Sequence, residues 1–242
     1  MSFNSLHELN FQIQTQHHAE AILTQDMPEA MHDIESVLKE IQLPIPELIR
    51  GGGGECELTQ RLRSEFSKRG WKKHRFQIDK IVDGKLSESI THEIDHVKKF
   101  ESGTFALEIE WNNKDTFFDR DLENFKRLHA EGAISIGGII TRAASLHEAL
   151  EDLFCRFAEK QDITSIEDLN PYNYKPTQRQ VGIIAKSTKK KGFAKAWARQ
   201  FFRDKFGEST THWNKLHDRI RRGVGNPCPL LLIGIPDTIV RF

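Results

Sequence analysis

Residues 105–142 contain a strand, a helix and a second strand in succession, and this order constrains the fold more than any other part of the sequence. The segment FALEIEW at 105–111 has apolar side chains at every second position, which is typical of a strand with one face in a core. A helical pattern with an apolar stripe follows and ends near Gly132. The run AISIGGIITR at 133–142 is almost continuously apolar, as expected for a strand buried on both faces. The sequence therefore predicts a βαβ unit with a parallel strand pair.

Antiparallel pairing is predicted immediately before this unit. The segment ITHEIDHVKKF at 90–100 is separated from the strand at 104–112 by the short turn Glu101-Ser102-Gly103. CPLLLIGIP at 228–236 is a further apolar run that predicts a buried strand. The predicted fold class is thus α/β, a mixed central β-sheet flanked by helices. The flanking helical patterns lie at 19–42, 57–70 and 144–159.

We expect residues 1–242 to form a single domain. The polar segment 160–185 contains NPYNYKPTQ, which predicts a loop or linker, and two basic helical patterns follow it. We therefore predict a late basic helical insertion at 160–222. Four consecutive glycines at 51–54 lack a following Gly-Lys-Ser or Gly-Lys-Thr, so they predict a flexible loop and not a phosphate cradle.

Charge is distributed unevenly along the chain. The 35 Lys and Arg balance 35 Asp and Glu, so the net charge neither requires nor excludes a nucleic-acid partner. Between Lys186 and Arg222, however, twelve Lys or Arg face only three Asp or Glu. Such a basic block is typical of a polyanion-binding surface, and a solvated helical face is the alternative. The run Lys189, Lys190 and Lys191 is a candidate phosphate contact.

The cysteines and the N-terminus indicate a cytoplasmic protein. Cys56, Cys155 and Cys228 are odd in number, widely spaced and outside any metal-ligand pattern, so we expect reduced thiols. The first residues lack the basic and apolar regions of a secretory signal. No apolar run approaches the roughly 20 residues that a membrane span needs.

Two glutamates on the strand at 105–111 point to chemistry. Glu108 and Glu110 share the face opposite the apolar one and lie roughly 6 to 7 Å apart along the strand. Their repulsion is relieved either by solvent, on an ordinary exposed edge, or by a cation. The predicted hairpin brings Asp95 beside them, and three such acids favour a Mg²⁺ site for phosphodiester hydrolysis. Asp119 and Asp121 on the next helix are interpreted as capping or solvated residues.

The order Asp95, hairpin, Glu108-Ile109-Glu110 resembles the PD-(D/E)XK nucleases. More narrowly, it is similar to the BamHI and BglII group of type II restriction endonucleases, in which Glu or Gln replaces the usual lysine. The resemblance extends to other segments of the chain. These are HAEAIL with IESVLKEI near the N-terminus, LTQRLRSEFSKRGWKK, and IRRGVGNPCPLLLIGIP near the C-terminus.

This resemblance implies a restriction-endonuclease-like fold and a Mg²⁺-dependent enzyme that cuts double-stranded DNA at a palindromic site, as a homodimer. By position, Asp95 and Glu108 would be metal ligands, with Glu93 and Glu101 as alternatives for the first acid. Glu110 occupies the lysine position, where it would bind metal or accept a proton from the attacking water. All three acids, Asp95, Glu108 and Glu110, are thus predicted to be catalytic and metal-binding.

The resemblance also implies DNA contacts. Asn113 falls where the group places a base-contacting asparagine, and Asn112 and Lys114 flank it. Ser209 and Thr210 are further candidates, together with the lysine run at 189–191. Two other functions remain open at this stage: a non-catalytic DNA-binding protein with a nuclease fold, and a nuclease that acts in repair or on modified DNA.

Overall fold

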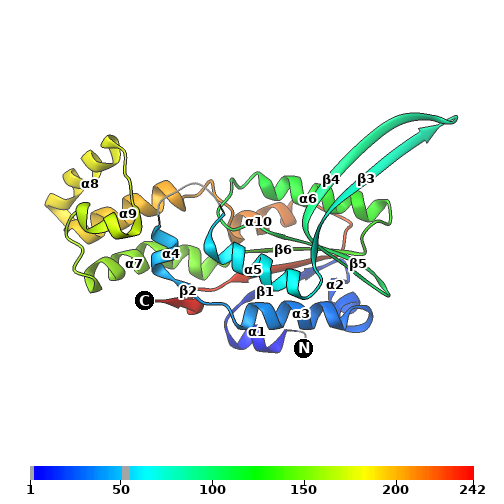
Figure 1. Ribbon diagram of the computed structural model, residues 1–242, viewed down its shortest axis with the longest axis horizontal. Helices are drawn as coiled ribbons and strands as arrows, with labels where there is room; N and C mark the ends of the chain where they lie inside the picture. Colours follow the sequence, from blue (N-terminus) through cyan, green and yellow to red (C-terminus); the bar gives the residue numbers. More distant parts are fainter. Residues whose placement is uncertain (1–2, 51–54) are drawn as a thin grey trace.

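A six-stranded mixed sheet forms the centre of the protein (Figure 1). The computed structural model describes residues 3–50 and 55–242, so the predicted loop at 51–54 lies outside the described residues. The strand order is β1-β7-β6-β5-β4-β3. In chain order these strands are β1 (Gln12–Gln16), β3 (Lys72–Val82), β4 (Lys85–Phe100), β5 (Gly103–Ile109), β6 (Ile136–Arg142) and β7 (Leu230–Ile235). A second, two-stranded sheet pairs β2 (Leu43–Pro44) with β8 (Val240–Arg241).

The central strands confirm the predicted βαβ unit. β5 pairs in parallel with β6, and α6 (Phe117–Ala130) connects them. β6 also pairs in parallel with β7, and every residue of both strands is buried. On its other side β5 pairs antiparallel with β4, as the turn at 101–103 predicted. The α/β fold class with a mixed sheet flanked by helices is therefore confirmed.

One face of the sheet packs against α6 and α10 (Trp213–Arg221). Ala106, Ile139 and Leu232 of the sheet share a buried cluster with the apolar stripe of α6 and with the inner side of α10. Gly137 of β6 allows this close approach, because a Cβ there would lie 2.7 Å from the ring of Phe125. The even-numbered side chains of β5 therefore point toward α6.

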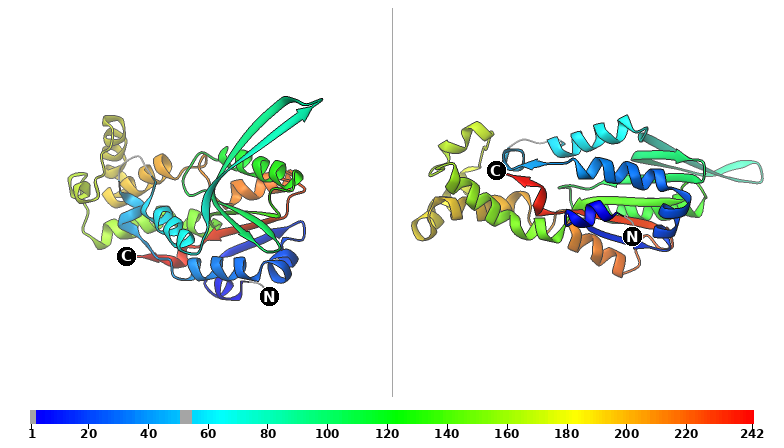
Figure 2. Two further views of the ribbon diagram at one scale, coloured as in Figure 1. Left: turned by 45° about the vertical axis from the view of Figure 1, so that its right-hand side comes forward. Right: turned by 90° about the horizontal axis from the view of Figure 1, so that it is seen from below.

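The opposite face packs against most of the other helices, and the view from below in Figure 2 shows the sheet between helices on its two sides. Phe105 and Leu107 of β5 belong to a large core that includes residues from these helices. The helices are α1 (Asn4–Glu8), α2 (Ala19–Ala21), α3 (Pro28–Lys39), α4 (Ile45–Ile49), α5 (Glu57–Lys68) and α7 (Ala144–Lys160). A π-helical turn, Ile22–Asp26, separates α2 from α3. Pro28 is the first residue of α3, a position where a backbone N–H has no partner within the helix, so proline costs no hydrogen bond there.

α8 (Gln178–Lys191) and α9 (Phe193–Lys205) form a helical part at the end of the molecule away from the β3–β4 hairpin (Figure 1). Trp197 and Phe201 of α9 belong to the same core as Phe105, and Phe154 of α7 lies 5.1 Å from the Phe201 ring. The segment NPYNYKPTQ at 170–178, predicted as a loop or linker, runs from the end of a 3-10 helix, Glu167–Tyr172, to the first residue of α8. Thr177 and Gln180 cap this helix reciprocally, which stabilises a start that the polar composition concealed.

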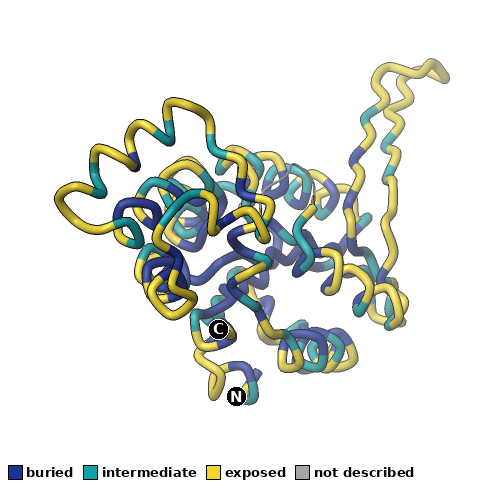
Figure 3. The backbone as a smooth tube through the Cα atoms, turned by 60° about the vertical axis from the view of Figure 1, so that its left-hand side comes forward, coloured by how far each residue is buried: buried dark blue, intermediate teal, exposed yellow. Residues whose placement is uncertain are grey.

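The β3–β4 hairpin projects beyond the rest of the protein (Figure 3). Its turn at Asp83 and Gly84 has positive φ angles at both residues, as a two-residue hairpin loop requires. The tip exposes the apolar side chains of Ile81 and Leu86, 66% and 63% exposed. The sequence predicted a strand and turn here but not the length of the arm.

β1 was not predicted from the sequence. Its residues QIQTQ are all half-buried and pair antiparallel with β7 at the sheet edge. Gln12 is held by a hydrogen bond from the backbone N–H of Ala144 to its side-chain oxygen, 2.9 Å. Among the described residues, none of the helices is both long and apolar enough to cross a membrane.

Candidate active site

Glu108 and Glu110 lie at the end of β5, between the sheet and α6. The backbone N–H of Glu110 donates to the carbonyl of Ile140 at 2.9 Å, and the hydroxyl of Thr141 donates to the carbonyl of Glu110 at 2.7 Å. β6 therefore holds the backbone of Glu110 beyond the last residue of β5. The period of two then places both glutamate side chains on the α6 side of the sheet.

Both glutamates are buried, with 5% exposure for Glu108 and 3% for Glu110. The alternative of a solvated strand edge is therefore wrong for these two side chains. A buried carboxylate loses its hydration and needs a proton, a hydrogen-bond donor or a cation in its place. This requirement makes the end of β5 the first place to look for chemistry.

Asp95 lies beside Glu108 on the neighbouring strand. His96 is paired with Leu107, so Asp95 is opposite Glu108 one residue further along the antiparallel register. The register between β3 and β4 shifts next to Asp95, between the pairs Lys72 with Val97 and His74 with Ile94. Such bulges re-aim side chains near active sites. The Asp95 side chain is 56% exposed, so it borders the solvent side of the acid group.

The alternatives for the first acid lie elsewhere. Glu93 is exposed and pairs with the Lys73 amine at 2.7 Å, whereas Asp95 lies 3.4 Å from the same amine. Glu101 is exposed in the turn between β4 and β5, at the opposite end of β5 from Glu110. The structure thus brings Asp95, and not Glu101, next to Glu108.

Asp121 of α6 joins the same group, which sequence reasoning missed. It is fully buried, and Arg120 Nε donates to its Oδ1 at 2.8 Å. Arg120 Nη2 also donates to Glu110 Oε1 at 3.2 Å. The interpretation of Asp121 as a solvated residue is wrong, because it follows Phe118 by three residues and lies on the apolar stripe of α6. An acid on an apolar stripe was the sequence signal for this position. We refer to Asp95, Glu108, Glu110 and Asp121 as the acid cluster.

The electrostatics of the acid cluster favour a positive partner. Burial, followed by repulsion from Asp121, Asp95 and Glu110, raises the pKa of Glu108 well above its usual range. Burial and the charge of Asp121 also raise the pKa of Glu110. Burial raises the pKa of Asp121 as well, although Arg120 opposes the shift. Glu108, Glu110 and Asp121, with the Arg120 guanidinium beside them, therefore favour protonated carboxyl groups whose protons a cation could replace.

Asn113 connects the acid cluster to the loop before α10. Its amide Nδ2 donates to Glu110 Oε2 at 2.6 Å. Its carbonyl accepts from the backbone N–H of Thr211 at 2.9 Å, and its own N–H donates to Thr211 Oγ1 at 3.1 Å. Lys114 forms an isolated antiparallel bridge with Thr210. Five of the predicted DNA-contacting residues are thus brought together, namely Asn112, Asn113, Lys114, Ser209 and Thr210.

Within this set the side chains differ in availability. Asn113, Lys114 and Ser209 are exposed, and Asn112 is half-buried with an Oδ1 that has no partner among the described residues. The Thr210 hydroxyl is already engaged, because it accepts from Arg142 at 2.7 Å and donates to the Gly207 carbonyl at 2.8 Å. Thr210 therefore has less hydrogen-bonding capacity left for a ligand than Ser209.

The lysine run is separate from this set. Lys189, Lys190 and Lys191 are exposed in the last turn of α8, where cations favour the helix dipole. They lie in the helical part that Figure 1 shows at the far end from the hairpin. The structure does not bring them together with Asn113.

A family model described as restriction endonuclease BglII/BglIII matches residues 11–235. The chain belongs to the BglII/BglIII restriction endonuclease family. A BglII-type enzyme is a type II restriction endonuclease, a site-specific deoxyribonuclease, so the resemblance noted in the sequence is confirmed. No individually curated protein matches the chain. The match covers the acid cluster, Asn113 and the lysine run, and therefore the whole region discussed above.

The acid cluster of this BglII-type chain has a donor set that fits a hard divalent cation. Its ligand atoms are all carboxylate oxygens, which Mg²⁺ prefers, and Asp95 leaves one side open to water. Within the described part of the chain, only His147, Glu208 and His212 already hold three ligand atoms within 4.8 Å of one another. The carboxylates of the acid cluster would therefore move closer together on binding an ion.

Proposed function

We propose that the enzyme is Mg²⁺-dependent and hydrolyses both strands of double-stranded DNA at a palindromic site, as a homodimer. The observation that carries the proposal is the acid cluster, in which Glu108 and Glu110 are buried with raised pKa values. A non-catalytic protein with this fold would gain nothing from burying repelling acids, since each costs solvation free energy. A cytoplasmic location is part of the proposal, and the three free cysteines favour it.

Asp95, Glu108 and Glu110 would hold the metal, and Asp121 would support Glu110 from α6. Mg²⁺ in such a site supplies Lewis-acid polarisation of a phosphodiester and an activated water. Glu110 is placed to accept a proton as the water oxygen bonds to phosphorus and one ester P–O bond breaks. Asn113 orients Glu110 through its 2.6 Å hydrogen bond. Arg120 donates to Glu110 Oε1 and to Asp121 Oδ1, and its charge can balance negative charge near the phosphate.

A groove beside the acid cluster offers a path for the DNA backbone. It has a volume of about 770 Å³, and its walls include Asp95, Asn112 and Asn113 together with the cations Arg63 and Lys73. Cations next to the acids attract phosphate to the position where it would be cut. Asn112 and Asn113 are then placed to contact bases, whereas Lys114, Ser209 and the lysine run would contact phosphates. We propose Thr210 only as a support for the loop.

The homodimer follows from the symmetry of the substrate. A palindromic duplex has a twofold axis, and each chain contributes one set of Asp95, Glu108 and Glu110. Two chains related by that axis would place one set at each strand. Sedimentation of the protein with and without a duplex tests this part separately from the chemistry.

The deciding experiment is cleavage of plasmid DNA with Mg²⁺ by the parent enzyme, Glu108→Gln and Glu101→Gln. Glu101 is a matched control, because it is an exposed glutamate in the turn next to β5. We expect discrete fragments from the parent and from Glu101→Gln, and a loss of at least about a thousandfold in Glu108→Gln. Glu108→Gln should keep its circular dichroism spectrum and its affinity for DNA.

Cleavage by Glu108→Gln near the parent rate would remove the acid cluster from the mechanism. A parent protein that binds but does not cut would support a non-catalytic DNA-binding protein. Random nicking, or cutting restricted to modified DNA, would support a repair or modification-dependent nuclease.

A further inference from the structure

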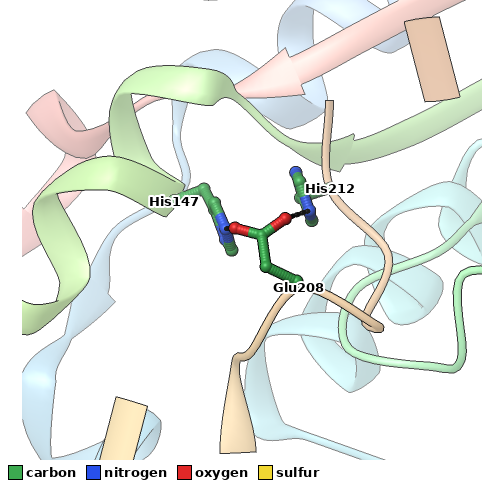
Figure 4. Close-up of side chains that lie close together, drawn as sticks. All are labelled: His147, Glu208 and His212. Carbon is green, nitrogen blue, oxygen red and sulfur yellow. Dashed lines mark ion pairs between the residues drawn. The ribbon is translucent and has the colours of Figure 1, made fainter. Parts of the chain in front are cut away.

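A second group of ionisable side chains lies apart from the acid cluster. His147 is in the first turn of α7, Glu208 is in the loop between α9 and α10, and His212 precedes the first residue of α10 (Figure 4). Glu208 Oε1 is 3.8 Å from His147 Nε2, and Glu208 Oε2 is 3.9 Å from His212 Nε2. The two imidazole rings are stacked, with centroids 3.8 Å apart. We call these three residues the histidine cluster.

Both histidines are buried without hydrogen-bond partners. His147 is 4% exposed and His212 is 1% exposed. Among the described residues, none of the four ring nitrogens has a partner in hydrogen-bonding geometry. The Glu208 carboxylate oxygens lie 3.8 and 3.9 Å from the two Nε2 atoms, which is too far for a hydrogen bond. Buried polar atoms are nearly always satisfied in native proteins, so these four nitrogens require a partner that the described residues do not supply.

The histidines are in the form that binds metals. Burial lowers the pKa of both, to about 3 for His212, and the positive charge of Arg142 adds to the effect. Both rings are therefore neutral near pH 7, with one nitrogen lone pair each available to an ion. The same burial makes a protonated pair very unfavourable, so a proton is a poor substitute for a metal here.

We infer that His147, Glu208 and His212 form a binding site for a transition-metal ion, with Zn²⁺ as the best-fitting candidate. Two imidazole nitrogens and one carboxylate oxygen are a typical zinc donor set, whereas Mg²⁺ prefers oxygen alone. All three ligand atoms already lie within 4.8 Å of one another. Tetrahedral ligands around Zn²⁺ are about 3.3 Å apart, so the donors need to approach by up to about 1.5 Å, with the stacked rings rotating to point at one ion.

Glu208 determines whether the site can hold a cation. Its side chain is 81% exposed, so it can move toward the histidines and leaves one coordination position open to water. Arg142 is fully buried near the cluster and repels a cation. The negative charge of Glu208 offsets this repulsion, so removal of that charge should weaken binding most.

An ion at this position would join three separate segments. α7 packs in the main core, α10 packs on the α6 side of the sheet, and the loop with Glu208 links α9 to α10. The same loop carries Ser209 and Thr210, which lie beside Asn113 and Lys114. The metal would thus fix the part of the loop that faces the proposed DNA-binding residues.

The test uses the full-length protein after treatment with a chelator, titrated with Zn²⁺ alone by calorimetry and by thermal unfolding. A Glu108→Gln, Glu110→Gln background removes two carboxylates of the acid cluster as competing ligands. In this background we expect one Zn²⁺ per chain and a rise in Tm of about 5 to 10 °C at a Zn²⁺ concentration one hundred times Kd. Excess Mg²⁺ should not displace the ion.

Glu208→Gln and His212→Gln should each weaken Zn²⁺ binding by at least about a hundredfold, since loss of a ligand exceeds the effect of losing a supporting group. Glu208 is exposed, so Glu208→Gln should leave the packing of the core and the folding of the protein unchanged. His217→Gln is the matched control, because His217 is a half-buried histidine on the same helix α10.

The proposal is overturned if Zn²⁺ does not bind in the background variant, since the ion would then belong to the acid cluster. It is also overturned if Glu208→Gln and His212→Gln bind Zn²⁺ as tightly as His217→Gln does. Neither result depends on DNA cleavage, so the proposed nuclease function stands or falls separately.

Discussion

The acid cluster and the histidine cluster are both buried groups of ionisable side chains, and burial acts on them in opposite directions. In the acid cluster burial raises the pKa values of Glu108 and Glu110, so protons are retained. In the histidine cluster burial lowers the pKa values of His147 and His212, so protons are lost. Both shifts disfavour charge, yet one site is left with oxygen ligands and the other with neutral nitrogen ligands. The two proposed sites therefore differ in the cation that each would prefer, Mg²⁺ at the acid cluster and Zn²⁺ at the histidine cluster.

The largest expected effect comes from reversing a charge in the acid cluster. Glu110→Lys should lower the rate of cleavage by at least about a thousandfold, because an ammonium would displace a cation held by Asp95 and Glu108. Rates measured over a range of Mg²⁺ concentrations check this. Glu208→Lys is the matched change in the histidine cluster, and it should leave Mg²⁺-dependent cleavage within about tenfold of the parent rate. Equal losses in both variants would break the distinction between the clusters.

The pH dependence of stability should distinguish the clusters next. Since the folded-state pKa of Glu110 is raised, the metal-free protein should lose stability as pH rises above 4.5, the ordinary glutamate value. Since the folded-state pKa of His212 is lowered to about 3, stability should also fall as pH drops below 6.5. At pH 5 the His212 contribution amounts to about 2 kcal/mol.

Urea unfolding in chelator at several pH values measures both effects. Glu110→Gln should remove the fall in stability between pH 4.5 and about 8, and His212→Gln should remove the fall between pH 6.5 and about 3, so the two variants change the slope of the profile in opposite directions. The comparison uses the slope of the unfolding free energy against pH, so a loss of stability that is the same at every pH does not affect it. Variants that change the slope in the same direction would contradict the assignment of opposite shifts.

A smaller effect is expected at Asn113, which lies between the clusters. An asparagine that pairs with adenine contributes about 1 to 3 kcal/mol of discrimination, so Asn113→Ala should lose affinity for the cognate duplex more than for a scrambled one. Binding isotherms on both duplexes measure the difference. Equal weakening on the two would indicate that Asn113 serves only to orient Glu110.

The smallest effect is expected in the lysine run, which is remote from both clusters. If Lys190 contacts a phosphate, Lys190→Ala should weaken binding to all duplexes alike and reduce the slope of log K against log salt by about 0.9. Isotherms at several salt concentrations check this. An unchanged slope would show that the end of α8 is a solvated surface.

The fold was predictable where local pattern and burial agree. β5, β6 and β7 have alternating or continuous apolar residues, and the turn at 101–103 is short enough to require a hairpin. β1 was not predictable in this way, because QIQTQ is polar at an edge and gains its order from pairing with β7. The start of α8 did have a local signal, the reciprocal cap of Thr177 and Gln180, which the polar composition outweighed.

The two clusters also differ in how far the sequence alone predicts them. Glu108, Glu110 and Asp95 lie on strands joined by one hairpin, so pairing rules alone bring them together. Asp121 could have been placed in the acid cluster from its position on the apolar stripe of α6 alone. His147 and His212, by contrast, are far apart in sequence and meet because α7 packs beside the loop before α10. No spacing pattern encodes such a contact, so it becomes visible only in three dimensions.

The short bridge between residues 113–115 and 209–211 has a consequence for how the enzyme could be controlled. Asn113 contacts Glu110 directly, and the backbone hydrogen bonds of Asn113 and Asp115 reach the loop that also carries Glu208 and leads to His212. These bonds, 2.9 and 3.0 Å long, fail if the loop shifts by about 1 Å. An ion at one proposed site would therefore restrict the loop that positions the other, and thermodynamic linkage would make such coupling reciprocal. The bridge thus makes one loop a shared support for both clusters, so the position of either cluster depends on the same two backbone hydrogen bonds.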